Sequence, residues 1–189
     1  MIITIHQPNF MPWYPFFQKM KQADIFVVLT HCQFEKNGFQ NRFNIDAAWK
    51  TMSVYKGLRA IREKKYVNAK RDWDKIKMSL PDYSSQLELF DDCISDSLVE
   101  TNLAIIRKIA DALNINTEIV IDYDTGSSGT QRLVDLCEHY SANGYIAGTS
   151  GRKYLEESLF IEGDIELTYQ CEADMIKKSI LEVLKTDVR

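Results

Sequence analysis

Short runs of apolar, β-branched residues alternate along this chain with segments whose apolar residues recur at helical spacing. The first apolar run extends from Ile2 to His6 and the second from Asp24 to Thr30, and residues 14–23 between them have the spacing of a helix. A strand, a loop, a helix and a second strand form the opening βαβ unit of a parallel sheet.

The same alternation continues through the rest of the chain. It predicts, in chain order, a short strand over 49–57, a helix over Arg71–Leu80, a helix over Ser97–Leu113, a strand over Glu118–Tyr123, a helix over Gln131–Tyr140, a strand over Gly144–Ala147, a strand over 164–170 and a helix over Asp174–Leu184. Helices that alternate with strands favour an α/β fold. We therefore expect a three-layer, mostly parallel, Rossmann-like sheet in a single domain over residues 1–189.

Composition agrees with a globular enzyme or binding protein. The chain is 45% hydrophobic and 11% aromatic, which is enough for a sizeable core. No apolar run approaches the roughly 20 residues that cross a membrane, and the first residues lack a basic segment followed by a long apolar one. The four cysteines form no CxxC pair, so neither a disulfide framework nor a zinc site is indicated. We expect a cytoplasmic protein without membrane insertion.

Charge is unevenly distributed. Residues 50–77 contain ten Lys and Arg but only three Asp and Glu, in a chain whose formal net charge is −4. Such a basic segment either attracts phosphate groups or polyanions, or forms a solvated helix face. Because the whole chain is acidic and has no nucleic-acid-binding motif, we do not expect nucleic acid as a partner.

Three loops of the predicted sheet are candidates for a ligand site. In open parallel sheets, ligands bind beyond the carboxyl ends of the strands, where loops diverge. The loops are His6–Pro15, His31–Asn44, and the segment that begins at Gly148.

The first loop combines three polar side chains, His6, Gln7 and Asn9, with three prolines that restrict its backbone. His6 is a candidate catalytic acid or base, or a donor to a phosphate group, because histidine titrates near neutral pH. The alternative is a hydrogen-bonded structural histidine at a strand end.

The second loop is rich in hydrogen-bonding side chains: Gln33, Glu35, Lys36, Asn41 and Arg42. Arg42 suits a carboxylate or phosphate group, Lys36 is a candidate catalytic residue that supplies a point charge, and Glu35 can accept a proton. The alternative is a surface loop that its phenylalanines hold against the core.

The third loop offers Gly148, Thr149, Ser150 and Arg152, whose backbone amides, hydroxyls and guanidinium favour anion binding near a helix start. An ordinary turn between a strand and a helix explains the same residues.

Two further patterns are weaker. His31 and Cys32 suggest a nucleophile pair, but neighbouring residues at a strand end point to opposite sides. Asp122 and Asp124 follow a predicted strand and are candidates to hold Mg²⁺ together with substrate phosphates.

Three motifs together resemble the WbqC-like family, bacterial proteins often found with genes for O-antigen and other surface polysaccharides. The motifs are IHQPNFMPW, FEKNGFQNRFNI and GYIAGTSGRKYLEESLF. The resemblance implies that the family's signature positions correspond to His6, Gln7, Pro8, Lys36, Asn41, Arg42, Gly148 and Arg152. It also implies acyl or aminoacyl transfer, for instance of a glycyl-type group, onto the amine of an activated amino sugar.

A more distant similarity links AGTSGR to the closing motif of the nucleotidylyltransferase superfamily, whose opening motif has two histidines where this chain has only His6. That similarity implies nucleotide binding and the release of pyrophosphate. Our leading hypothesis is thus an acyl or aminoacyl transferase for a nucleotide sugar. The alternatives are a nucleotidyltransferase and a non-catalytic sugar-nucleotide binding module. ATP and Mg²⁺ stay open as cofactors, and the sequence leaves the oligomeric state open.

Overall fold

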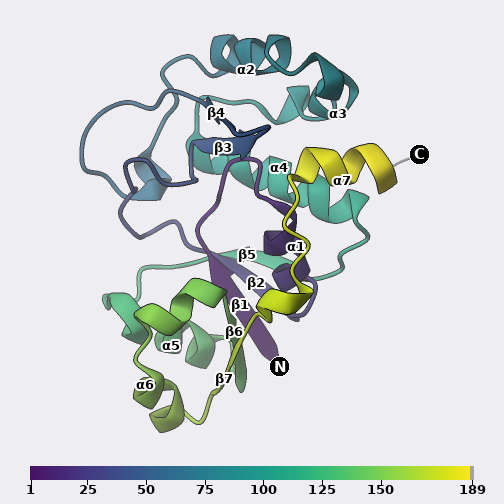
Figure 1. The fold of residues 1–189 in the computed structure, drawn as a ribbon. Helices are drawn as coiled ribbons and strands as arrows, with labels where there is room; N and C mark the ends of the chain where they lie inside the picture. The colour runs from purple at the N-terminus through teal and green to yellow at the C-terminus, as the bar shows by residue number, and fades with distance from the viewer. Residues whose placement is uncertain (188–189) are drawn as a thin grey trace. The chain divides into compact units, whose positions relative to one another are not determined.

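The structure, a computed structural model, describes residues 1–187 and groups them into two compact units (Figure 1). The first, here the sheet unit, consists of Met1–Gln7, Pro15–His31 and Asn116–Ile176. The second, the hairpin unit, consists of Pro8–Tyr14, Cys32–Ile115 and the residues from Lys177 onward. The expected single domain over the whole chain stays a prediction.

The sheet unit contains a five-stranded, entirely parallel sheet. Its strands are β1 (Ile2–His6), β2 (Ile25–Val28), β5 (Glu118–Ile121), β6 (Gly144–Ala147) and β7 (Glu166–Tyr169), in the order β5-β2-β1-β6-β7. The predicted α/β class with a mostly parallel sheet is confirmed. Strands β1 and β6 have the predicted bounds, and the other three are shorter than predicted.

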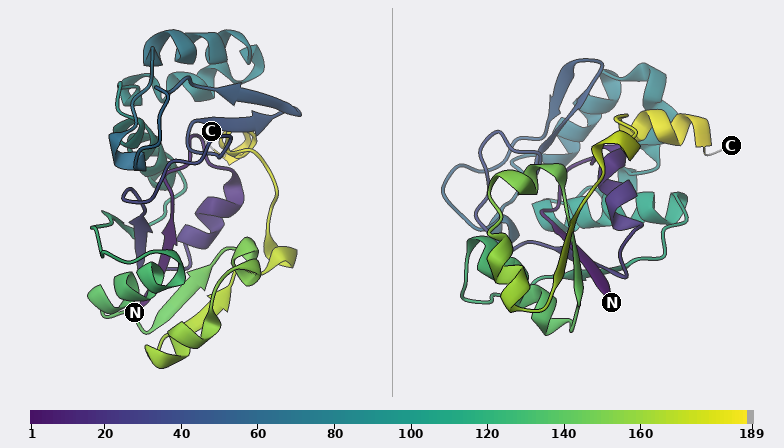
Figure 2. Two further views of the ribbon diagram at one scale, coloured as in Figure 1. Left: turned by 90° about the vertical axis from the view of Figure 1, so that its left-hand side faces the viewer. Right: turned by 60° about the horizontal axis from the view of Figure 1, so that its bottom comes forward.

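Helices cover both faces of this sheet. Helix α1 (Tyr14–Met20) lies on one face, and α5 (Gly129–His139) and α6 (Glu157–Glu162) lie on the other (Figure 2). Neighbouring residues of β2 divide between the two faces, because side chains alternate along a strand. The ring of Phe26 packs 5.0 Å from that of Phe16 of α1. The predicted three layers are therefore present.

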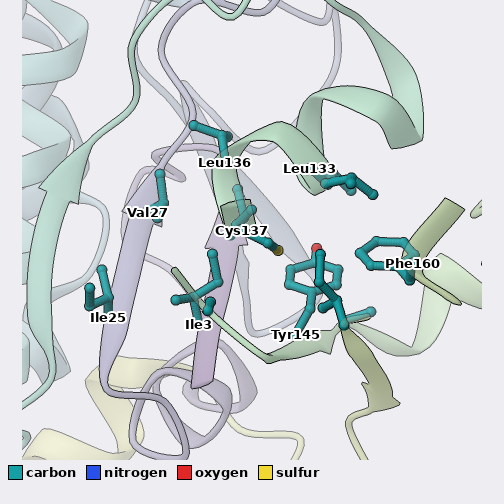
Figure 3. Packing of buried hydrophobic residues seen from close by; sticks show 13 residues of the cluster. Ile3, Ile25, Val27, Leu133, Leu136, Cys137, Tyr145 and Phe160 are labelled. Carbon is teal, nitrogen blue, oxygen red and sulfur yellow. The ribbon is translucent and has the colours of Figure 1, made fainter. Parts of the chain in front are cut away.

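The core between the sheet and α5 and α6 is a cluster of aliphatic, aromatic and cysteine side chains (Figure 3). Strands β1, β2 and β6 contribute Ile3, Val27 and Tyr145, and helix α5 contributes Leu136. The rings of Tyr145 and Phe160 stack with an interplanar angle of 2°. Each side chain buried in such a core stabilises the fold by roughly 1.5–3 kcal/mol.

The hairpin unit is mainly helical and carries one antiparallel hairpin. Its helices are α2 (Ala69–Met78), α3 (Ser84–Glu88), α4 (Leu98–Ala112) and α7 (Ile180–Asp187), and its strands are β3 (Arg42–Ile45) and β4 (Ala48–Thr51). Asp46 and Ala47 join the two strands with φ of 51° and 59°, the left-handed conformations of a two-residue hairpin turn. The predicted strand over 49–57 is therefore shorter and belongs to this hairpin.

Short 3₁₀ helices complete both units: η1 (Ile61–Glu63), η2 (Pro81–Tyr83), η3 (Asp91–Cys93), η4 (Thr149–Lys153) and η5 (Glu172–Asp174). Side-chain caps set the starts of two α-helices. The Asn68 side chain accepts a hydrogen bond from Arg71 N at the start of α2, and Ser97 accepts one from Glu100 N at the start of α4. The predicted helices over Arg71–Leu80 and Ser97–Leu113 are thus confirmed within two residues at each end.

The predicted helix over Asp174–Leu184 begins too early, because α7 starts only at Ile180. The Gln18 side chain donates to Asp174 O at 3.0 Å and accepts from Ile176 N at 2.9 Å. These bonds occupy backbone groups that a helix would need. The helix can begin at Ser179, whose backbone N–H donates to the Glu182 carboxylate at 2.7 Å, as in a capping box.

Charged side chains of the basic segment 50–77 bind groups within the hairpin unit. Lys64 is 3% exposed and donates to the carbonyl oxygens of Tyr55 and Gly57 at 2.9 and 2.8 Å. Lys77 pairs with Asp91 at 2.7 Å. These contacts favour the interpretation of the segment as a structural and solvated region over that of a polyanion site.

Candidate functional site

The carboxyl edge of the parallel sheet contains a topological switch point. From β1, the chain builds the sheet in one direction through β2 and β5, and in the other through β6 and β7. In doubly wound folds, ligands bind where the strand order reverses in this way, outside the carboxyl ends of the two central strands. Here those strands are β1, which ends at His6, and β6, which is followed by Gly148.

His6 is partly buried at this edge and its orientation is defined. Nδ1 lies 2.9 Å from the carbonyl oxygen of Gln7, and the ring meets that of Phe16 edge-on at 4.9 Å. A carbonyl oxygen can only accept, so Nδ1 carries the proton of the neutral ring. The Nε2 atom of His6 is therefore a hydrogen-bond acceptor.

Burial and a neighbouring lysine keep His6 neutral. Lys19 of α1 is 3% exposed, and its Nζ donates to Ile5 O at 3.3 Å. Burial lowers the pKa of the Lys19 ammonium group to about 7. Burial and the nearby Lys19 charge together lower the pKa of His6 to about 3. At neutral pH, His6 is thus a weak base that accepts hydrogen bonds and has no Nε2 proton to donate.

The segment after β6 lies beside His6, because Thr4 of β1 pairs with Ile146 of β6 in the parallel register. Thr149 is partly exposed and Ser150 is exposed at the start of η4. The Arg152 guanidinium lies 4.1 Å over the ring of Tyr169 and remains exposed. The structure thus brings the predicted first and third loops together at the switch point, through His6 and Gln7 on one side and Gly148 to Arg152 on the other.

The two glycines of this segment have different surroundings. A Cβ atom at Gly151 would lie 3.2 Å from Ala147 Cβ and 2.9 Å from a methyl group of Leu155, whereas no atom lies within 4 Å of a Cβ atom at Gly148. Gly148 also has φ of −69° and ψ of 160°, which any residue adopts. Gly151 is therefore required for packing, and Gly148 is not.

We expect Gly151→Ala to lower the free energy of unfolding by about 1–2 kcal/mol, because the added methyl group overpacks the core. Gly148→Ala is the matched control and should change stability by less than about 1 kcal/mol. Urea denaturation of both variants measures the difference. Equal stabilities of the two variants would contradict this account of the loop.

In the hairpin unit, parts of the first and second predicted loops are tied together by Asn102 of α4. This side chain is 0% exposed, and its Nδ2 donates at 2.7 Å to Pro8 O and at 2.7 Å to Gln40 O. Its Oδ1 accepts a hydrogen bond from the buried Tyr66 hydroxyl at 2.8 Å. Asn102 thus organises both loops, and the sequence analysis did not single it out.

Two predicted site residues of the second loop have their polar groups engaged by the protein itself. Arg42 donates through Nε to Gly38 O at 3.2 Å and through Nη2 to Asn37 O, and its guanidinium lies 4.0 Å over the Trp49 ring. Asn41 is buried, and its Nδ2 donates to Met52 O at 2.7 Å. Both side chains hold the loop in its conformation.

The remaining predicted residues of the hairpin unit differ in exposure. Glu35 and Lys36 are exposed on the second loop, Asn9 is buried on the first, and Gln33 is exposed and pairs with Ala60 through an isolated β-bridge. Their proposed roles in ligand binding stay predictions.

The sequence analysis also missed a histidine–carboxylate pair in the sheet unit. His31 Nδ1 lies 3.0 Å from the carboxylate of Asp122, at the carboxyl ends of β2 and β5. Asp124, the residue that the sequence pairs with Asp122, is exposed and lies 3.7 Å from the Arg132 guanidinium. The signal that could have predicted this pair is a histidine and an aspartate that each follow one of two predicted strands.

Within residues 1–187, no group of three or more His, Cys, Asp or Glu side chains is arranged to hold a metal ion. Among the helices of the same residues, none has the length and apolar character needed to cross a membrane.

Comparisons with known proteins bear on the predicted family. A family model described as the WbqC-like protein family matches residues 7–177. Among curated proteins, the chain is similar to the uncharacterized protein Rv1507c of Mycobacterium tuberculosis, with 28% identity over 186 residues that cover 88% of this chain and 80% of that protein. No solved structure matches the chain significantly. The resemblance carried by the three motifs is therefore confirmed.

Proposed function

This chain belongs to the WbqC-like protein family, and on that premise we propose that it is a transferase of surface-polysaccharide biosynthesis. It attaches an acyl or aminoacyl group, such as a glycyl group, to the amine of a nucleotide-activated amino sugar. When the donor is a free carboxylic acid, ATP supplies the activation.

The observation that carries this proposal is the switch point between β1 and β6, with open space at Gly148. Strand orders of this kind place a nucleotide's phosphates at the loops that follow the two central strands. Thr149 and Ser150 offer hydroxyl groups there, and Arg152 offers a guanidinium for an anionic group. These groups support binding of the diphosphate of a nucleotide sugar.

The state of His6 favours acyl transfer over nucleotidyl transfer. Nucleotidyl transfer through this histidine would require an N–H group that donates to a phosphate, yet Nδ1 donates to Gln7 O and Nε2 is unprotonated. An acceptor nitrogen suits the N–H group of a sugar amine. We assign His6 the role of orienting the amine.

Product formation tests the proposal. The protein is incubated with a UDP-linked amino sugar and either an acyl thioester or glycine with ATP, and products are followed by mass spectrometry. UDP-glucose, which has no amine, is the matched control substrate. We expect the UDP-linked amino sugar to gain the mass of the acyl group and UDP-glucose to gain none. The His6→Ala variant should give no such mass gain. Release of pyrophosphate from a nucleoside triphosphate and a sugar phosphate would instead indicate nucleotidyl transfer, and tight binding without any turnover a binding module.

Binding to the switch point makes a separate prediction. Gly148→Ala should weaken binding of the nucleotide sugar by about tenfold or more, because its methyl group occupies the open space where a phosphate would approach the backbone, and a tenfold change corresponds to about 1.4 kcal/mol. Isothermal titration calorimetry on wild type and variant measures the effect. Asn116→Ala, an exposed loop variant, is the control with unchanged affinity. Wild-type affinity in Gly148→Ala would place the ligand elsewhere.

A further inference from the structure

We propose that His31 and Asp122 are the proton-accepting pair of this site, with His31 Nε2 as the general base. The inference rests on the proposed transfer to a sugar amine, and it assigns the proton transfer to residues outside the family motifs.

The Asp122 carboxylate is fixed by four hydrogen bonds. Its Oδ1 accepts from Thr30 N at 2.7 Å, from Thr30 Oγ1 at 2.7 Å and from His31 Nδ1 at 3.0 Å, and its Oδ2 accepts from His31 N at 3.3 Å. The side chain of Asp122 is 0% exposed, and that of His31 is 15% exposed. A buried carboxylate that accepts this many hydrogen bonds is held in one orientation.

This carboxylate determines the tautomer of His31. Because an ionised carboxylate can only accept, Nδ1 of His31 is the donor, and Nε2 is left with its lone pair. When Nε2 takes up a proton, the imidazolium faces the negative charge of Asp122, which stabilises it. Aspartate performs the same two tasks, orientation and charge stabilisation, for the histidine of a serine-protease triad.

The pair lies on the same sheet edge as the proposed nucleotide site. Strand β2, which leads to His31, pairs with β1 such that Val28 is opposite His6, and Leu29 N donates to His6 O at 2.9 Å. His31 therefore follows the strand next to the switch point. The backbone N–H of Asp122 donates to Val28 O at 3.0 Å, and this hydrogen bond fixes the position of Asp122 next to the end of β2.

The two histidines of this edge have different surroundings. His6 is buried next to Lys19, and both the burial and the lysine charge disfavour a positive ring, whereas Nδ1 of His31 lies 3.0 Å from the Asp122 carboxylate. A group whose pKa lies far below the pH of the reaction, as that of His6 does, is a poor proton acceptor. His6 is therefore suited to orient the neutral amine, and His31 to remove its proton.

The step balances as follows. The lone pair of the unprotonated sugar amine attacks the carbonyl carbon of an activated ester or thioester and forms the C–N bond. An N–H proton passes to His31 Nε2. The carbonyl is restored as the bond to the leaving group breaks, the leaving oxygen or sulfur takes the bonding pair, and His31 returns the proton to it. The products are the amide and the free alcohol or thiol.

Turnover of matched histidine variants tests the assignment. His31→Gln should lower kcat by about 10²-fold or more, in the range of lost acid–base catalysis, while KM and the calorimetric affinity for the UDP-linked amino sugar stay unchanged. Asp122→Asn should lower kcat as well. His139→Gln, which alters an exposed histidine of α5, is the control with wild-type turnover.

Two outcomes of the turnover assay overturn the inference in distinguishable ways. If wild type transfers the acyl group and folded His31→Gln retains the wild-type kcat, the inference fails and the proposed function stands. If wild type binds the nucleotide sugar but transfers no group from any donor, both fail. ¹⁵N NMR of the imidazoles gives a readout that needs no turnover: we expect a protonated Nδ1 in His31, and a protonated Nε2 in the neutral ring would also overturn the inference.

Discussion

Asn102→Ala is expected to lower the free energy of unfolding by about 3–5 kcal/mol, because it leaves several buried groups without partners at about 1–3 kcal/mol each. The alanine methyl group cannot replace the donors to Pro8 O and Gln40 O or the acceptor for the Tyr66 hydroxyl. Part of this loss is recovered where water enters the space. The remaining effect is large because the Asn102 side chain forms hydrogen bonds with groups in three separate segments of the chain.

Urea denaturation followed by circular dichroism measures this loss. Asn44→Ala is the matched control, since Asn44 is exposed on β3 of the same unit, and it should change stability by less than about 0.5 kcal/mol. A loss below about 1 kcal/mol for Asn102→Ala would mean that the loops do not depend on this side chain.

The second large effect concerns pH. The pKa of His6 is about 3 in the folded protein and 6.5 in the unfolded chain. Between these values the unfolded state binds a proton that the folded state does not, so the folded state loses stability as the pH falls. Above pH 6.5, neither state is protonated and the contribution is constant. From about pH 7.5 to 4.5, we expect His6 to account for a loss of about 2–3 kcal/mol.

The comparison of wild type with His6→Gln isolates this contribution. Free energies of unfolding are measured from about pH 7.5 to 4.5, and the variant should lose about 2–3 kcal/mol less than wild type over that range, whatever its stability at the upper end. His139→Gln, at an exposed position, should keep the wild-type slope. Parallel curves for wild type and His6→Gln would show that His6 titrates normally in the folded protein.

Local patterns in the sequence were sufficient to predict most of the sheet unit. The strands Ile2–His6 and Gly144–Ala147 have their predicted bounds because each is a short apolar run with a polar or glycine residue at its end. Helical spacing likewise placed α1 and α5. The carboxyl edge of the sheet followed from the order of elements, and the candidate site proposed there stays a prediction.

Features that depend on distant partners could not be predicted in this way. Arg42 looked free to bind an anion, but carbonyl groups four and five residues earlier and the ring of Trp49 occupy its guanidinium. The role of Asn102 depends on loops 94 and 62 residues away, and the His31–Asp122 contact joins residues 91 apart. Periodicity contains no information on such pairings, since they arise only when the strands have assembled.

The division of the chain into two units has a consequence for biosynthesis. Each unit is built from three separate segments, and the chain passes from one unit to the other five times. During translation, β1 emerges first but cannot acquire its neighbour β6 until about residue 147 has left the ribosome, because Ile2 pairs with Gly144. Pairing over such separations is slow and leaves strand edges unpaired in the meantime. The nascent chain therefore has an unpaired edge of β1 until β6 has emerged, and no single cut through the gene would yield either unit complete.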